Sequence, residues 1–262
     1  MQKRGLAVVS ALMLLFSVFH VTYAEEIPEK QYIVKYKPAG IALMHEDSGN
    51  GSFDVVNEAS LKELCEENRI AWYEEDYEVE LLEDTSGDSA SDSKYDESKW
   101  DLSMLQADFP YMLNCEGQNV KIGVIDSGIA EHEELNANVL EGYDYINNTT
   151  DTNDTYGHGT FVSGIIAAAD DNKGIIGAAP KAKLVPLKCF NEKTTKLSVI
   201  CKAIYGAVDE FGCDIINMSF GLTENSTVLK EAIDYAVNHG VIVVAAVGNY
   251  GNTSLYYPAA YD

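Results

Sequence analysis

The sequence has little positive charge. It contains 18 lysine and arginine residues against 42 aspartate and glutamate residues, which gives a formal net charge of −24 at pH 7. This balance argues against nucleic acid or an anionic membrane surface as a partner, because both repel an acidic protein. It favours a soluble protein that can bind cations. Hydrophobic residues make up 46% of the chain, which is enough for one or two domains with a real core.

Beyond its first residues the sequence also lacks an apolar run of membrane-spanning length. Near the start, Lys3 and Arg4 precede an apolar run over residues 6–21, and a Thr-Tyr-Ala sequence ending at Ala24 follows it. This pattern predicts a cleavable secretory signal over residues 1–24, and therefore a secreted protein with no membrane contact after cleavage. A membrane anchor is the alternative, but the run is short and interrupted by polar residues.

Cysteine is scarce and odd in number. The five residues are Cys65, Cys115, Cys189, Cys201 and Cys213. The sequence selects no disulfide pairing among them. The last three fall on apolar positions of expected strands and helices, so we predict buried free thiols there.

The first part of the chain after the signal has the pattern of a small unit over residues 25–82. An alternating strand is expected over 31–37, an amphipathic helix over 60–70 and a closing strand over 77–82. The next stretch, 83–98, is rich in Ser, Asp and Gly and has no apolar face, which predicts an exposed acidic linker.

From residue 99 to residue 262 the pattern changes to apolar segments separated by helical ones. The expected strands are 120–126, 183–190, 213–221 and 241–249, and the expected helices are 104–113, 158–169, 197–211 and 226–239. Such alternation predicts an α/β fold, a doubly wound parallel sheet covered on both faces. Sites in these sheets form at the carboxyl ends of strands, where Asp126, Ser219 and Asn249 are expected.

One stretch organises this second part. Residues 157–169, GHGTFVSGIIAAA, place His158 between two glycines at the start of an expected helix. Neutral imidazole in such a position can act as a general base near pH 7. Upstream, VKIGVIDSG ends a buried strand in Asp126, and downstream VIVVAAVGN ends another in Asn249. A turn histidine that only begins a helix is the alternative for the isolated motif.

In this order, VIDSG, GHGT and AAVGN resemble the subtilisin-like serine proteases, the subtilases. The intervals from Asp126 to His158 and from His158 to Asn249 are about 32 and about 91 residues, as in subtilisin. The resemblance implies a serine endopeptidase acting on polypeptides, expected to be a monomer. Asp126 would orient His158, His158 would take the proton of the nucleophilic serine, and Asn249 would bind the oxyanion. It also implies that 25–82 is a propeptide, the partner that covers the cleft until maturation.

The nucleophilic serine is the departure from this pattern. In subtilisin it follows the asparagine by about 66 residues, which here lies beyond Asp262. The only serine after Asn249 is Ser254, whose context does not suit a nucleophile. We therefore expect the front part of a longer protein, inactive as residues 1–262. The alternatives are a catalytically dead subtilase-like module that binds peptides and, less favoured, a propeptide that acts as a stand-alone inhibitor.

The resemblance also implies substrate and metal sites. Ser219, Phe220 and Gly221 would pair with extended substrate backbone, while Ala245, Ala246 and Gly248 would line a specificity pocket, their small size favouring a large apolar side chain. Residues 169–175 fit a calcium loop, with Asp171 as its side-chain ligand and Glu134 as a second carboxylate. A solvated acidic loop is the alternative to structural Ca²⁺.

Overall fold

The computed structural model of the chain describes residues 29–37, 53–82, 102, 115–171, 173–251 and 253–261. The chain divides into two compact units, Met1–Lys30 and Gln31–Asp262, and every element described below belongs to the second. The predicted signal over 1–24, the linker over 83–98 and the helix over 104–113 all fall on residues that are not described. Within the described ranges, no helix is long and apolar enough to cross a membrane.

A parallel sheet of five strands forms the centre of the second unit, in the order β11-β9-β5-β7-β6. Its strands are β5 (Lys121–Asp126), β6 (Tyr143–Asp144), β7 (Lys183–Lys188), β9 (Ile215–Met218) and β11 (Ile242–Ala245). Strands β5 and β7 are buried along almost their whole length, as near-continuous apolar runs in parallel sheets are. The predicted parallel sheet is confirmed.

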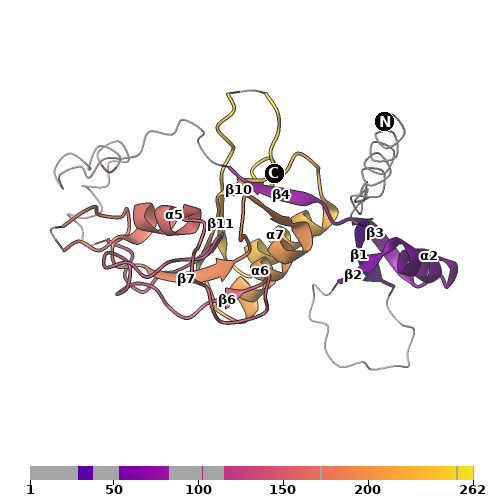
Figure 1. Cartoon of the computed structure of the whole chain (residues 1–262), viewed down its shortest axis with the longest axis horizontal. Coiled ribbons are helices and arrows are strands. Elements are labelled where there is room, and N and C mark those ends of the chain that lie inside the picture. Colours follow the sequence, from indigo (N-terminus) through magenta and orange to yellow (C-terminus); the bar gives the residue numbers. More distant parts are fainter. Residues whose placement is uncertain are drawn as a thin grey trace, which may run out of the picture. The chain divides into compact units, whose positions relative to one another are not determined.

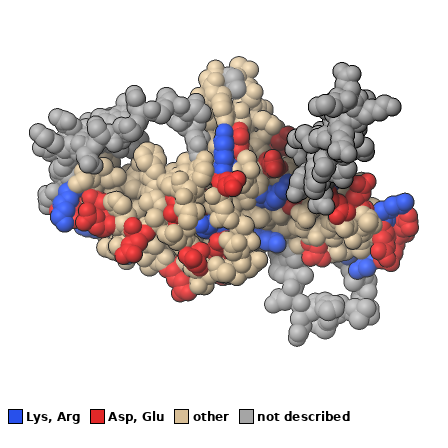
Figure 2. Space-filling view, in the orientation of Figure 1, with Lys and Arg blue, Asp and Glu red and all other residues tan. Residues whose placement is uncertain are grey.

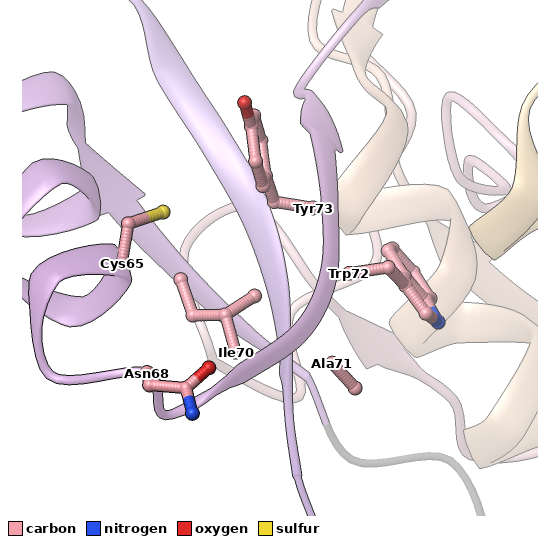
Figure 3. A pocket seen from close by; sticks show the side chains of 6 residues that line it. All are labelled: Cys65, Asn68, Ile70, Ala71, Trp72 and Tyr73. Carbon is pink, nitrogen blue, oxygen red and sulfur yellow. The ribbon is translucent and has the colours of Figure 1, made fainter.

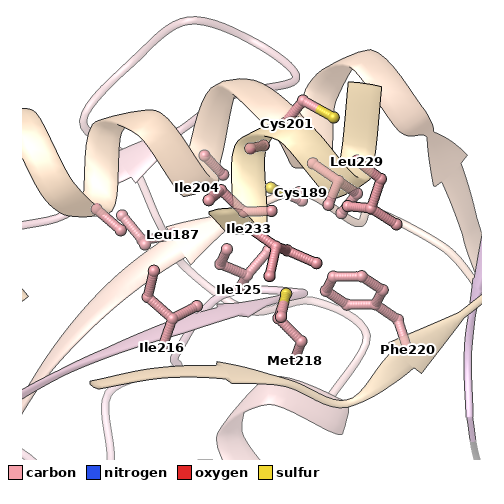
Figure 4. Packing of buried hydrophobic residues seen from close by; sticks show 14 of the residues in the cluster. Ile125, Leu187, Cys189, Cys201, Ile204, Ile216, Met218, Phe220, Leu229 and Ile233 are labelled. Atoms are coloured by element: carbon pink, nitrogen blue, oxygen red, sulfur yellow. The ribbon is translucent and has the colours of Figure 1, made fainter. Parts of the chain in front are cut away.

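Helices cover both faces of this sheet. On one face α6 (Leu197–Asp209) and α7 (Thr227–Asn238) lie side by side over Ile125 and Leu187 (Figures 1 and 4). On the other face, α5 (His158–Ala167) contributes Ala167 to a separate cluster. That cluster also contains Ile122, Val124 and Leu184. Alternate residues of each strand therefore enter different cores, which fixes the register and holds the strand ends rigidly.

A second, smaller sheet has the order β2-β1-β3, and its strands are β1 (Gln31–Tyr36), β2 (Asp54–Asn57) and β3 (Ile70–Glu75). Helix α2 (Glu58–Glu66) begins at Asn57, whose side chain accepts a hydrogen bond from Ser60 N. It ends earlier than predicted, because Asn68 has a left-handed φ of 56° and Ile70 already starts β3. A cavity of about 320 Å³ lies between α2 and β3 (Figure 3).

The closing strand predicted over residues 77–82 forms, but not in the sheet expected. Strand β4 (Glu78–Leu81) lies between β8 (Thr194–Lys196) and β10 (Phe220–Gly221), antiparallel to both. The single strand predicted over 213–221 is likewise two strands, β9 and β10, which belong to different sheets. Strand β10 leaves the parallel sheet to pair with β4, so long-range pairing overrides the local pattern.

Three cysteines behave as the sequence predicts. Cys189, Cys201 and Cys213 are buried free thiols. Burial raises the pKa of each, and that of Cys213 reaches about 11. These groups therefore stay protonated at neutral pH and pack as small apolar side chains.

The surface carries the acidic excess in dispersed form. Figure 2 shows aspartate and glutamate side chains at many places on the visible face, with basic side chains scattered among them. No continuous basic area occurs on the described part of that face.

Candidate active site

Asp126 and His158 form the centre of the site. Asp126 is the last residue of β5 and its side chain is fully buried. Its Oδ1 lies 2.8 Å and its Oδ2 3.0 Å from Nδ1 of His158, so the predicted contact is confirmed. An ionised carboxylate only accepts, so Nδ1 donates and the neutral ring keeps its lone pair on Nε2. The pair is thereby arranged as a general base with an orienting carboxylate.

Asp154 holds the start of α5, which carries His158. Its Oδ1 accepts hydrogen bonds from Tyr156 N (2.9 Å) and Gly157 N (2.8 Å). Its Oδ2 accepts from N (2.9 Å) and Oγ1 (2.6 Å) of Thr160. Burial raises the pKa of Asp154, but the hydrogen bonds from Gly157 and Thr160 outweigh it and leave the pKa below its ordinary value. The carboxylate thus accepts from one backbone amide of the first helical turn, Thr160 N, and from the two backbone amides just before the helix.

The two positions beside His158 require glycine for different structural reasons. Gly157 has a left-handed φ of 102° at the helix start, which favours glycine. A Cβ at Gly159 would collide with the carbonyl oxygen of Gly128 and press on Asp126. The second glycine therefore lets α5 approach the end of β5 closely enough for His158 to reach Asp126.

Asn249 faces the same cavity as His158. It lies in the loop after β11 rather than at the end of the strand, which stops at Ala245. Its Nδ2 donates a long hydrogen bond of 3.5 Å to the carbonyl oxygen of Leu82, just beyond β4. The cavity has a volume of about 630 Å³ and is lined by Leu82, Tyr156, His158, Phe161, Val162, Ser219, Ala246 and Asn249.

The segment Ser219–Gly221 binds the backbone of β4. Phe220 pairs with Leu81 and Gly221 with Glu80, while Leu82 N donates to Ser219 O at 3.1 Å. These are the antiparallel contacts by which an extended peptide adds to a sheet edge. The Phe220 side chain is fully buried in the core, so only its backbone serves β4.

The three residues predicted for the pocket wall are placed differently. Ala246 lines the cavity itself, and its backbone N donates to Met218 O. Ala245 ends β11 and packs against the main core. Gly248, with φ of 87°, lies beside the ring of Tyr256.

The two predicted metal ligands come together apart from this cavity. Glu134 is 6% exposed, and its Oε2 has no hydrogen-bond partner in the described part of the chain. Burial raises the pKa of Glu134, and the negative charge of Asp171 raises it further. A Cβ at Gly174 would collide with Oε1 of Glu134. No group of three or more His, Cys, Asp or Glu placed to hold a metal occurs among the described residues.

Sequence reasoning missed Leu82 and Asp154, and it also missed three side chains that line the cavity, Tyr156, Phe161 and Val162. Leu82 was expected only as the end of a closing strand, and its one signal was the change from alternating apolar residues to the acidic linker. Asp154 precedes the GHGT motif in a polar stretch, where an aspartate next to a helix start is the only indication of a cap.

Comparison with known proteins assigns this arrangement to a family. The profile described as "Subtilase family" matches residues 117–262, more than half of the chain. The chain belongs to the subtilase family. The matched region of this subtilase begins just before β5 and contains Asp126, His158 and Asn249.

Individual relatives agree with this assignment. The subtilase is 30% identical over 280 residues to minor extracellular protease Epr of Bacillus subtilis (strain 168), covering 100% of the chain and 43% of that protein. It is 38% identical over 167 residues to subtilisin DY of Bacillus licheniformis, covering 62% of the chain and 60% of the relative. Fervidolysin from Fervidobacterium pennivorans, a keratinolytic enzyme related to subtilisin, superposes with a TM-score of 0.68 and 25% identity. That superposition covers 89% of this chain and 42% of fervidolysin. The chain thus spans about half the length of these relatives.

Proposed function

We propose that this subtilase is the precursor of a secreted serine endopeptidase that hydrolyses peptide bonds with Asp126, His158 and a serine. One observation carries the proposal: the carbonyl oxygen of Leu82 accepts from Asn249 in the cavity that His158 lines. An extended segment therefore presents a peptide carbonyl beside a general base and an amide donor. These are the groups that acyl transfer to a serine needs.

Each residue has a defined role in this reaction. His158 takes the proton of the serine through Nε2, and Asp126 keeps the ring in the required tautomer and stabilises the imidazolium. Asn249 donates to the carbonyl oxygen as negative charge develops on it, which shortens a bond that is 3.5 Å long before attack. We place the nucleophilic serine about 66 residues past Asn249, the interval found in subtilisin.

We further propose that residues 25–82 are a propeptide. Strand β4 lies between β8 and β10, where an extended substrate would pair, and the end of β3 together with the turn after it contacts the first turns of two helices. Glu74 accepts from Ser226 Oγ (2.5 Å) and Thr227 N (3.0 Å) at the start of α7. Asp76 accepts from N (2.9 Å) and Oγ (2.8 Å) of Ser198 at the start of α6. These contacts support a segment that assists folding and covers the cleft until it is removed.

We also propose a structural calcium ion at the loop over residues 169–175. The fit rests on Glu134, whose buried Oε2 lacks a hydrogen-bond partner among the described residues, next to the negative charge of Asp171. Calcium prefers such hard oxygen ligands, carboxylates together with backbone carbonyls. Glu134 and Asp171 would hold the ion, whose chemistry here is to neutralise their mutual repulsion.

Secretion is proposed from the signal pattern over residues 1–24 and from a relative that is itself named extracellular. Polypeptides are the proposed substrates, and a monomer acting without nucleic acid or membrane is proposed from the acidic composition.

The test of the proposed function uses the product of the complete coding sequence. A fluorophosphonate probe, which modifies only activated serines, should label the wild-type protein, and the protein should hydrolyse a peptide substrate. His158→Ala should abolish both, because the serine then lacks its base. A folded wild-type protein that binds peptides but shows neither labelling nor hydrolysis would instead be the catalytically dead module.

A further inference from the structure

Leu82 lies in the cavity in the manner of a residue about to be cut. Its backbone N donates to Ser219 O, and its carbonyl oxygen accepts from Asn249 Nδ2, so both polar backbone groups are held by site residues. Its side chain is buried, at 6% exposure. A Cβ built on Gly221 would lie 3.1 Å from Leu82 Cδ1, which places the leucine methyl group directly against that glycine.

The ring of Tyr256 lies in the space next to Gly221 and Gly248, where neither glycine has a side chain. Its Cδ1 lies 3.3 Å from a Cβ built on Gly221, and its Cδ2 lies 3.5 Å from one built on Gly248. Opposite edges of one ring therefore contact the two glycines, and the same glycine, Gly221, meets both the ring and Leu82. Of the three small residues that suggested a roomy pocket from sequence, Gly248 therefore has an aromatic ring packed beside it.

The tyrosine is held in this position on two sides. The next residue, Tyr257, exchanges backbone hydrogen bonds with Leu222, N to O at 2.9 Å and O to N at 3.0 Å. On its other side the ring stacks on Tyr250, with centroids 5.5 Å apart and an interplanar angle of 26°. Tyr250 in turn donates from its hydroxyl to Glu80 Oε1 on β4 at 3.1 Å. Tyr256 is therefore a fixed wall.

We propose that the precursor is cut on the carboxyl side of Leu82 and that Tyr256 limits the specificity pocket to leucine-sized aliphatic side chains. The inference rests on the proposed endopeptidase function. Its substrate class is extended polypeptide with leucine before the cut, and aromatic side chains at that position are disfavoured because their rings need the volume that Tyr256 occupies.

The cut balances as a hydrolysis. The serine oxygen forms an ester with the carbonyl carbon of Leu82 as the bond to the next amide nitrogen breaks, and His158 passes the serine proton to the leaving amine. Water then attacks the same carbon and gives a proton to His158, and the ester bond to the serine oxygen breaks as His158 passes that proton to the serine oxygen. The products are a carboxylate on Leu82 and a free amine on Glu83, with no oxidant or reductant.

The first measurement is the amino-terminal sequence of the mature protein made from the complete coding sequence. It should begin at Glu83. The inference would be overturned by a mature protein that hydrolyses peptides, begins at another residue of 83–98, and shows no intermediate that begins at Glu83. That result would leave the proposed function standing. Absence of serine labelling and of hydrolysis would instead contradict the proposed function itself.

The second measurement compares peptides that differ only in the residue before the cut. Wild type should show kcat/KM at least about 10-fold higher for leucine than for phenylalanine, the size of effect that a misfitting apolar group produces. Tyr256→Ala should remove or reverse this preference, and Tyr235→Ala on α7 should leave it unchanged. Equal use of both peptides by wild type, or the same preference in Tyr256→Ala, would overturn the role of Tyr256.

A compensating pair keeps the test independent of folding. Leu82→Phe should slow self-cleavage of the precursor about 10-fold, since the ring meets Tyr256. Adding Tyr256→Ala to Leu82→Phe should restore the rate, which a general folding defect would not allow. A precursor with Leu82→Phe that matures at the wild-type rate, or a double variant that stays slow, would contradict the shared pocket.

Discussion

Asn249 is the residue whose change tests the chemistry of the site most directly. Asn249→Ala should lower kcat about 10²- to 10³-fold with little change in KM, because its amide matters most once the oxyanion forms. Steady-state hydrolysis of a leucine peptide measures this. Asn238→Ala, at the exposed end of α7, serves as the control. A large rise in KM with unchanged kcat would show that Asn249 only binds substrate.

Asp154 should contribute to stability in a pH-dependent way. Its pKa is lower in the folded state than in the unfolded chain, so its contribution is complete above the unfolded pKa of about 3.9. It is lost as the pH falls through the folded-state pKa. Asp154→Asn should lower the free energy of unfolding by about 1 to 2 kcal/mol at pH 7, the usual value of a helix cap.

Urea unfolding of wild type and of Asp154→Asn at a series of pH values tests this. The difference between the two proteins should be constant near neutral pH and should shrink below about pH 4. A difference that grows on acidification would contradict the assignment of Asp154 as an ionised cap.

The residues that could be predicted from sequence are those whose neighbours are local. His158 was found because the glycines and the helix that place it are adjacent in the chain, and Asp126 because it ends an unbroken apolar strand. Leu82 could not be found in this way. Its partner Asn249 is 167 positions away, and no local pattern encodes that contact.

At the scale of elements, α7 begins against the end of β3 and α6 begins against the turn that follows β3. The residue before α6, Lys196, offers no side-chain cap, and Asp76 supplies one from outside the helix. Glu74 adds to the cap that Ser226 gives α7. If residues 25–82 are the propeptide we propose, Glu74→Ala and Asp76→Ala should each weaken binding of that segment, once released, by about 1 to 2 kcal/mol.

Inhibition of the mature enzyme by added propeptide measures that loss, expected as about a 5- to 30-fold rise in the inhibition constant. Glu63→Ala, on the exposed side of α2, is the matched control. If all three variants inhibit equally well, the carboxylates do not hold the propeptide on the two helices.

The periodicity of the sequence predicted the positions of the helices and strands better than it predicted which strands pair. Buried runs such as β5 and β7 were expected as parallel strands, because a short, continuously apolar run between two helical patterns is typical of a strand that is covered on both faces. The division between β9 and β10 at Ser219 was not expected, since the chain reads as one apolar segment there. It arises only because β4 offers β10 a partner in another sheet.

For the whole molecule, calcium should raise the melting temperature of the mature enzyme. An ion that binds only the folded state adds about 2.7 kcal/mol of stability at a hundredfold excess over Kd, or roughly 5 to 10 °C. Asp171→Ala should remove most of this shift while leaving kcat largely intact, because neither Glu134 nor Asp171 lines the active cavity.

Differential scanning calorimetry with calcium and with a chelator measures the shift, and Asp234→Ala on α7 provides the surface control. Identical melting curves of the wild type in both conditions would mean that the loop over residues 169–175 is a solvated acidic turn. The assignment to the subtilase family would be unaffected.

The central position of β4 between β8 and β10 has a kinetic consequence. While the segment is part of the same chain, its effective concentration at the cleft is set by tethering, on the order of millimolar for short flexible connections, and not by the amount of protein present. If the proposed function holds, the first cut will therefore be a first-order event whose half-life is independent of dilution. After that cut, occupancy of the cleft would become an ordinary bimolecular equilibrium, so the proposed enzyme would stay inhibited where it is concentrated and become active as it diffuses away.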